Sequence, residues 1–220
     1  MDLEHSLLQL DRFYNAPLEF PAEERAERIE QIFAKVLYLS HGNLEPGTPL
    51  PFTELESRFL IGLSFRQNLQ FLILQSQELD DSGVLLTRRS RLRMAPAFRE
   101  VSRYSYMEYF YAFVLPYFAE REDQVDADDD GARSLFERSD LHGLEDALAS
   151  DERVRVFTNE NDFLLRRDDV AWLQATLGER LTLFEEGGHL GNLYREYLQR
   201  EIGSTIKEEA GDDPHDTRRP

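Results

Sequence analysis

Two short polar segments near the C-terminus carry the residue types used in acid–base chemistry. Asp162 ends the polar run 159–162, and His189 follows the glycine pair 187–188, which allows a sharp backbone turn. A carboxylate bonded to one imidazole nitrogen fixes the tautomer of the ring and leaves the other nitrogen free to accept a proton. We therefore expect Asp162 and His189 to be the acid and the base of a catalytic site, with Glu160 as a rival for the acid.

The flanking segments predict how these two side chains meet. Residues 154–158 and 181–184 have the β-branched and aromatic composition of strands. Residues 168–177 between them predict a helix, with two aspartates in its first turn and a glycine at its end. A strand, a helix and a strand at this length predict a βαβ unit with parallel strands. Functional groups gather at the carboxyl ends of such strands, so Asp162 and His189 should lie side by side.

Two runs of sequence frame this predicted unit. Val-Arg-Val-Phe-Thr-Asn-Glu-Asn-Asp-Phe-Leu-Leu occupies 154–165, and Leu-Thr-Leu-Phe-Glu-Glu-Gly-Gly-His-Leu-Gly-Asn-Leu occupies 181–193. Their succession resembles the end of the α/β-hydrolases, in which the acid of the triad precedes the histidine in the chain. The resemblance implies that Asp162 is the acid and His189 the base of a serine hydrolase. It favours Asp162 over Glu160 because Asp162 directly precedes the apolar residues 163–165.

The serine of such a triad lies in a Gly-x-Ser-x-Gly turn between a strand and a helix. The nearest match is Gly-Leu-Ser-Phe-Arg at 62–66, in which an arginine replaces the second glycine. Thr53 and Glu56 have the spacing of a capping box, which predicts that Ser64 lies inside a buried helix. The strands that carry the nucleophile and the oxyanion hole are therefore expected upstream of Met1 or on another chain. By itself this chain should not hydrolyse esters.

The rest of the sequence predicts helices. Segments with helical spacing or strong helical composition are residues 3–13, 22–39, 53–77, 102–118, 134–149 and 190–202. We expect an α/β protein, a partial α/β-hydrolase with a mostly helical cap-like region over 1–150. The parallel βαβ unit and a C-terminal helix should occupy 151–203, and residues 204–220 should form a disordered charged tail.

Composition excludes several classes of function. The net charge of −18, from 25 basic and 43 acidic residues, argues against nucleic acid and anionic membranes as partners. The absence of cysteine excludes disulfides and thiolate chemistry. No stretch is apolar enough for a transmembrane helix, and the N-terminal residues lack the pattern of a signal peptide. The compartment stays unknown, with the cytoplasm as the default.

Two further sets of residues have the types that bind metal ions. Residues 126–137 match the calcium-loop pattern D-x-D-x-D-G-x₅-E, although a solvated acidic loop is the favoured interpretation. His5, His41, His142 and His215 lack metal-ligand spacing and are expected to be surface or capping residues. Residues 88–93 form a basic patch in an acidic protein. No motif in the sequence indicates a cofactor, so none is expected.

The leading hypothesis is an esterase- or lipase-like serine hydrolase, of which this chain supplies the acid, the base and a helical cap. The aromatic run 102–118 and residues 65–74 could line a pocket for an apolar ester or lipid-like substrate. The alternative is a non-catalytic, largely helical interaction module derived from the same fold. Its exposed apolar face would bind a second copy or a complementing chain.

Overall fold

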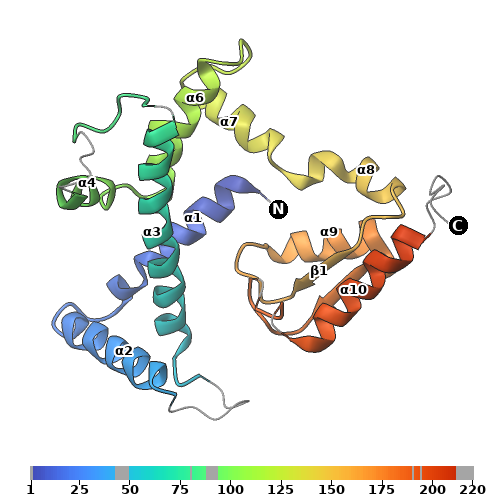
Figure 1. Cartoon of the computed structure of the whole chain (residues 1–220), viewed down its shortest axis with the longest axis horizontal. Helices are drawn as coiled ribbons and strands as arrows, with labels where there is room; N and C mark the ends of the chain where they lie inside the picture. The colour runs from blue at the N-terminus through green and yellow to red at the C-terminus, as the bar shows by residue number, and fades with distance from the viewer. Residues whose placement is uncertain are drawn as a thin grey trace, which may run out of the picture. The chain divides into compact units, whose positions relative to one another are not determined.

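The structure is a computed structural model that describes residues 2–42, 50–79, 81–87, 94–189, 191–193 and 195–211. Helices dominate this part of the chain, and its one sheet has two strands (Figure 1). The chain divides into two compact units, a helical unit of residues 7–138 and a C-terminal unit of residues 139–220 with residues 1–6. The boundary falls at residue 139 instead of the predicted 151.

The helical unit begins with long helices whose starts follow from local sequence. Its helices are α1 (Leu3–Tyr14), α2 (Arg25–Ser40), α3 (Glu54–Leu79), α4 (Met94–Val101), α5 (Tyr106–Tyr109), α6 (Leu115–Ala119) and α7 (Asp129–Arg138). The predicted capping box at the start of α3 is confirmed. Glu56 Oε2 accepts a hydrogen bond from Thr53 N at 2.8 Å, and Glu56 N donates to Thr53 Oγ1 at 3.3 Å.

Gly62 explains how closely α1 and α3 approach each other. A Cβ atom at Gly62 would lie 2.2 Å from the backbone nitrogen of Tyr14, which no side chain could tolerate. The glycine of the Gly-Leu-Ser run therefore serves helix packing. Ser64, two residues later, is exposed on α3, so the prediction that it is buried is wrong. The burial of α3 is confined to positions on its packed faces, such as Phe59 and Leu69.

The aromatic run is not one continuous helix. Ser105 and Glu108 form a capping box that starts α5, and a π-helical turn at Phe110–Val114 then leads into α6. Pro116, in the first turn of α6, has no N–H to donate, which favours an interruption of the regular helix just before it. The aromatic rings mostly pack against one another. Phe110, for example, stacks on Phe136 with ring centroids 4.4 Å apart.

A buried polar network ties α1, α3 and α5 together. One oxygen of Asp11 contacts Arg66 Nη1 at 3.2 Å and accepts from Tyr106 N at 2.8 Å, and the other accepts from Met107 N at 3.0 Å. The hydroxyl of Tyr106 donates to the carbonyl oxygen of Phe65 at 2.8 Å. Burial raises the pKa of the Tyr106 hydroxyl to about 12.

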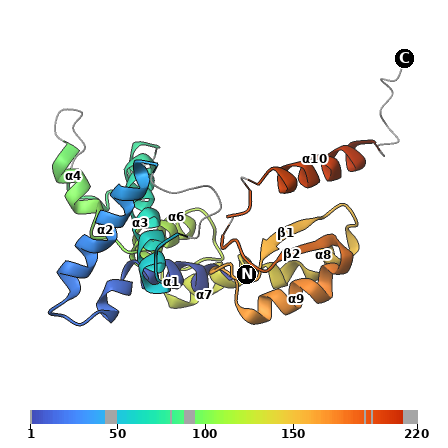
Figure 2. The ribbon, with the colours of Figure 1, turned by 90° about the horizontal axis from the view of Figure 1, so that it is seen from below.

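The C-terminal unit contains the predicted βαβ arrangement. Its main elements are α8 (Glu145–Ser150), β1 (Val156–Asn159), α9 (Arg167–Leu177), β2 (Leu181–Phe184) and α10 (Glu196–Gly211). The strands are parallel, with Val156 opposite Leu181 and Asn159 opposite Phe184, so this part of the prediction is confirmed. Gly178 ends α9 with a positive φ of 55°, which favours glycine. Figure 2 shows the strand pair between α9 and α10.

The last helix differs from its prediction at both ends. It starts at Glu196 instead of 190, because residues 191–193 form a turn in which Gly191 lies against Gly187. It continues to Gly211, so residues 204–211 are helical and the prediction of a disordered tail is wrong for them. Residues 212–220, with His215, and the basic patch at 88–93 lie outside the described residues.

Candidate acid–base site

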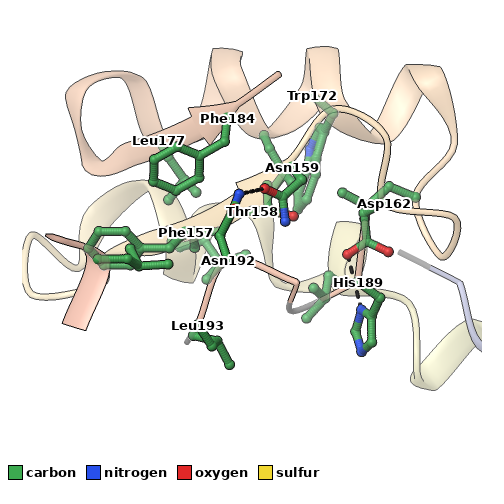
Figure 3. Close-up of a pocket in the computed structure, with 16 residues that line it drawn as sticks. Phe157, Thr158, Asn159, Asp162, Trp172, Leu177, Phe184, His189, Asn192 and Leu193 are labelled. Atoms are coloured by element: carbon green, nitrogen blue, oxygen red, sulfur yellow. Dashed lines mark hydrogen bonds and ion pairs between the residues drawn. The ribbon is translucent and has the colours of Figure 1, made fainter. Parts of the chain in front are cut away.

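Asp162 and His189 meet beyond the carboxyl ends of β1 and β2. Asp162 Oδ2 lies 3.1 Å from His189 Nδ1 (Figure 3). The Asp162 side chain is 9% exposed and that of His189 is 29% exposed. When the imidazole is neutral, a proton on Nδ1 bonds to the carboxylate and Nε2 carries the lone pair. This arrangement leaves Nε2 as the nitrogen able to take a proton from another group.

The turn after β1 fixes the Asp162 carboxylate. Its Oδ1 atom accepts a hydrogen bond from Leu164 N at 3.0 Å, while Oδ2 faces the imidazole. Asp162 N donates to Asn159 O at 3.1 Å, which closes the turn. The rival acid Glu160 is exposed, and its backbone N–H extends the strand ladder by donating to Phe184 O at 2.8 Å. The buried carboxylate at this edge of the sheet is thus Asp162.

The loop after β2 brings His189 to the same edge. Gly187 and Gly188 both have positive φ, 150° and 58°, which side-chain-bearing residues rarely adopt. A Cβ atom at Gly187 would lie 2.3 Å from Asn192 Nδ2. Phe163 packs edge-on against the imidazole, with ring centroids 5.9 Å apart. The glycine pair therefore allows both the turn and the close approach.

An apolar cavity of about 220 Å³ adjoins the Asp162–His189 pair (Figure 3). Its lining includes both members of the pair and apolar side chains of the C-terminal unit, among them Leu165, Trp172 and Leu177. Residues 156–159, the whole of β1, also line it, although successive residues of a strand face opposite sides. The cavity therefore runs along the length of β1.

The aromatic run lines a different cavity from the one predicted. In the helical unit, a cavity of about 600 Å³ is bounded by residues 109–121 and by the end of α3 and the segment after it. Residues 65–74, the predicted partners of the aromatic run, do not line this cavity. Tyr109 and Phe113, which do, stack on each other with ring centroids 5.4 Å apart.

The calcium-loop pattern takes a different form in the structure. Residues 129–137 lie in α7, and Asp128 Oδ1 caps this helix by accepting from Asp130 N at 3.1 Å and Gly131 N at 3.0 Å. Asp130 and Glu137 of the pattern therefore lie in a helix instead of an extended loop. Across the described residues, no group of three or more His, Asp or Glu side chains is placed to hold a metal ion.

The scattered histidines have three different environments. His41 caps the end of α2, with Nδ1 2.7 Å from Leu37 O, as predicted for a capping residue. His142 instead lies between carboxylates, with Nδ1 2.7 Å from Asp140 and Nε2 3.6 Å from Asp169. His5 has a buried Nε2 that lacks a hydrogen-bond partner in the described part of the chain. His5 as a whole is half-buried, and this burial lowers the pKa of its imidazole.

The polar residues that hold the site were missed at the level of sequence. Asn159, Asn161 and Asn192 make the hydrogen bonds that join the loop of Asp162 to the loop of His189. Their clearest signal in the sequence is their position, since each lies within three residues of Asp162 or His189. Recognising them requires the backbone conformation of residues 186–192.

No protein-family model, curated protein or solved structure matches this chain. None of the helices in the described residues is long and apolar enough to span a membrane. The geometry of the Asp162–His189 pair, together with its adjoining apolar cavity, therefore carries the functional argument.

Proposed function

We propose that this chain supplies the acid and the general base of an α/β-hydrolase-like serine hydrolase that acts on apolar esters. One observation carries the proposal, the contact of 3.1 Å between a buried carboxylate and an imidazole at the ends of two parallel strands. A single acid or histidine in a loop is usually structural. A pair joined through Nδ1, beside an apolar cavity, has the arrangement that acyl transfer requires.

The proposed reaction uses the two nitrogens of His189 differently. Nε2 removes the proton of a serine hydroxyl as its oxygen forms a bond to the ester carbonyl carbon. The resulting imidazolium then gives this proton to the leaving alkoxide when the ester C–O bond breaks. Water then attacks the acyl-serine through the same two proton transfers, which releases the carboxylic acid and restores the serine hydroxyl. Asp162 holds the Nδ1 proton and stabilises the imidazolium without itself becoming protonated.

The nucleophile must come from a complementing segment in this proposal. Ser64 is exposed on the helix α3, and Gly62, two residues before it, packs against the backbone of α1. This segment therefore does not form a nucleophile turn. In the described residues β1 pairs with β2 alone. Parallel sheets normally have more strands and are covered on both faces. Within the part of the chain that the structure describes, the other edge of β1 has no strand partner, so a further strand would add there.

The lining of the cavity indicates the substrate class. Leu165, Trp172 and Leu177 are apolar, and the polar atoms that share the cavity belong mainly to the acid–base pair and its neighbouring asparagines. An ester with an apolar acyl or alkyl group would bury that group here and keep its carbonyl near His189. A charged substrate would lose its hydration without gaining a partner among the apolar side chains.

The test uses the native polypeptide that contains this sequence, purified from its source cells. A fluorophosphonate probe, which labels activated serines, should label this polypeptide. The His189→Ala variant should not be labelled. Its rate of 4-nitrophenyl butyrate hydrolysis should fall at least 1,000-fold, roughly the loss seen when a triad member is removed. The matched control is His41→Ala, which removes a capping histidine of the helical unit. Labelling or hydrolysis that survives His189→Ala would contradict the proposal.

An interaction module is the second candidate, and the surface of α2 favours it. Phe33, Val36 and Leu37 follow one another at helical spacing and are 45%, 37% and 62% exposed. An exposed apolar stripe of this kind commonly marks an association surface. Light scattering on the purified chain distinguishes the two functions when combined with the probe. A stable dimer without labelled serine in the native polypeptide favours the module.

A further inference from the structure

Three asparagine side chains join the loop of Asp162 to the loop of His189, and two of them hold Gly188 from both sides. Asn159 Nδ2 donates to Gly188 O at 2.6 Å, and Gly188 N donates to Asn161 Oδ1 at 2.7 Å. Gly188 is the residue directly before His189. Both backbone polar groups of Gly188 are therefore bonded to side chains, one from the last residue of β1 and one from the turn after it.

Asn192 closes the network from the other end of the same loop. Its Nδ2 atom donates to Asn159 Oδ1 at 2.5 Å and to Glu186 O at 2.7 Å. Asn159 and Asn192 are only 4% and 3% exposed. Buried amides without partners would cost free energy, so these bonds keep both side chains in one arrangement.

The backbone carbonyls decide which way each amide points. Gly188 O and Glu186 O can only accept, so the atoms facing them, Asn159 Nδ2 and Asn192 Nδ2, must be the donating NH₂ groups. Asn159 then presents its oxygen to Asn192. At Asn161 the polarity is reversed, because its side-chain oxygen faces the N–H of Gly188. The network requires donors at two positions and an acceptor at the third.

Two glycines of this loop, Gly187 and Gly191, lie very close to other atoms. A Cβ atom at Gly187 would lie 2.4 Å from Asn159 Oδ1, and a Cβ atom at Gly191 would lie 1.7 Å from Gly187 O. The backbone is thus folded tightly on both sides of His189. The direction of the His189 side chain is set by the peptide units that the asparagines hold.

We propose that Asn159 and Asn192 are positioning residues, which hold His189 so that Nδ1 faces Asp162 and Nε2 faces the reacting group. This inference rests on the proposed function for its catalytic meaning, but its geometric content concerns the ring of His189 alone. Loss of either amide donor turns a hydrogen bond to a backbone carbonyl into a repulsion between two oxygens. The loop then shifts, and the imidazole no longer keeps one tautomer.

The test replaces each asparagine by the isosteric aspartate in the full chain. Asn159→Asp and Asn192→Asp remove required donors, whereas Asn161→Asp keeps the acceptor that Gly188 N needs. The readout is the ring ¹⁵N spectrum of His189 at a pH where the imidazole is neutral, assigned by comparison with His189→Gln. The wild type and Asn161→Asp should show a single Nδ1–H tautomer, and the other two variants should show a tautomer mixture. Asn68→Asp, at an exposed position of α3, controls for the added charge.

The outcomes separate this inference from the proposed function. If wild-type His189 itself shows mixed tautomers, the acid–base pair does not form and both ideas fail. If the wild type has one tautomer and all three aspartate variants keep it, the positioning role is wrong while the proposed function stands. Thermal unfolding followed by circular dichroism guards against a folding defect. If Asn159→Asp or Asn192→Asp unfolds, the milder Asn159→Ser and Asn192→Ser variants replace it and should show the same tautomer mixture.

Discussion

Asp11 of α1 caps the first turn of α5 through the backbone N–H groups of Tyr106 and Met107, and one of its oxygens also bonds Arg66. This one carboxylate thereby bonds two residues that lie 95 and 96 positions away from it in the chain. The side chains of Asp11 and Arg66 are 16% and 10% exposed, so the ion pair is largely removed from water. One largely buried carboxylate therefore links the helices α1, α3 and α5 of the helical unit.

Asp11→Ala should strongly destabilise the helical unit. The substitution leaves Arg66 buried without its charge partner and two N–H groups without an acceptor, a combination that costs about 3–5 kcal/mol. Urea unfolding followed by circular dichroism measures the loss. Glu23→Ala, which removes an exposed carboxylate before α2, is the control and should change the free energy of unfolding by less than about 0.5 kcal/mol. An equal effect of both substitutions would contradict the network.

Gly62→Ala should also be costly, for a steric reason. The new Cβ atom would lie 2.2 Å from Tyr14 N, so α1 and α3 must separate. Overpacking of this kind costs about 1–3 kcal/mol or more. The control is Gly203→Ala in α10, where a Cβ atom has open space and alanine should add about 0.5–1 kcal/mol of helix stability. A neutral Gly62→Ala variant would show that the two helices are not in this contact.

Protonation of His5 should loosen the N-terminal residues from the rest of the C-terminal unit. Burial, followed by the nearby charge of Arg166, lowers the pKa of His5 below 6.5, and the carboxylates of Asp2 and Asp169 only partly oppose this. The unfolded chain then binds the proton more tightly than the folded chain. The resulting stability is present above pH 6.5 and is lost as the pH falls through the lowered folded-state pKa.

The His5→Phe variant removes the proton-binding site while keeping an apolar ring. Its free energy of unfolding should depend less on pH, between pH 6.5 and acid values, than that of the wild type. Urea unfolding at several pH values gives this comparison, and His41→Phe serves as the control on an exposed histidine. Parallel curves for wild type and His5→Phe would rule out a lowered pKa at His5.

Trp172 should report on ligand binding, because it is the only tryptophan in the sequence and it lines the apolar cavity. We expect saturable quenching of its fluorescence by 4-nitrophenyl butyrate, whose nitroaryl group is an acceptor of tryptophan emission. Leu193→Phe, at a 43% exposed position of the lining, should narrow the cavity and weaken binding several-fold. 4-Nitrophenol alone controls for absorption of the emitted light. Linear quenching that is the same in both proteins would exclude binding in the cavity.

Local patterns predicted the elements that depend on neighbouring residues. The capping box of Thr53 and Glu56 and the glycine that ends α9 are set by short-range chemistry. The parallel pairing of β1 with β2 follows from the succession of a strand, a helix and a strand. The same patterns predicted that Asp162 and His189 lie at one edge of the sheet, as they do in the structure. Their catalytic roles stay predictions.

Other features depend on contacts that no local pattern contains. The role of Gly62 needs the backbone of Tyr14, 48 positions away in the chain, to be in place. The π-helical turn at Phe110–Val114 arises where packed aromatic rings meet a proline. The late start of α10 follows from the contact of Gly191 with Gly187. At Gly62 and in the aromatic run, tertiary packing overrides a regular helical pattern, whereas at Gly191 the fold of the turn after β2 does so.

The bonds that fix the acid and the base all lie within one supersecondary unit, from Asn159 to Asn192. Their formation needs only this unit to fold, with its two parallel strands joined across the crossover through α9. In the proposed function, the proton-transfer half of the site is therefore ready before any nucleophile arrives. A further strand that carried a nucleophile would then complete the site by assembly, without a conformational change at His189.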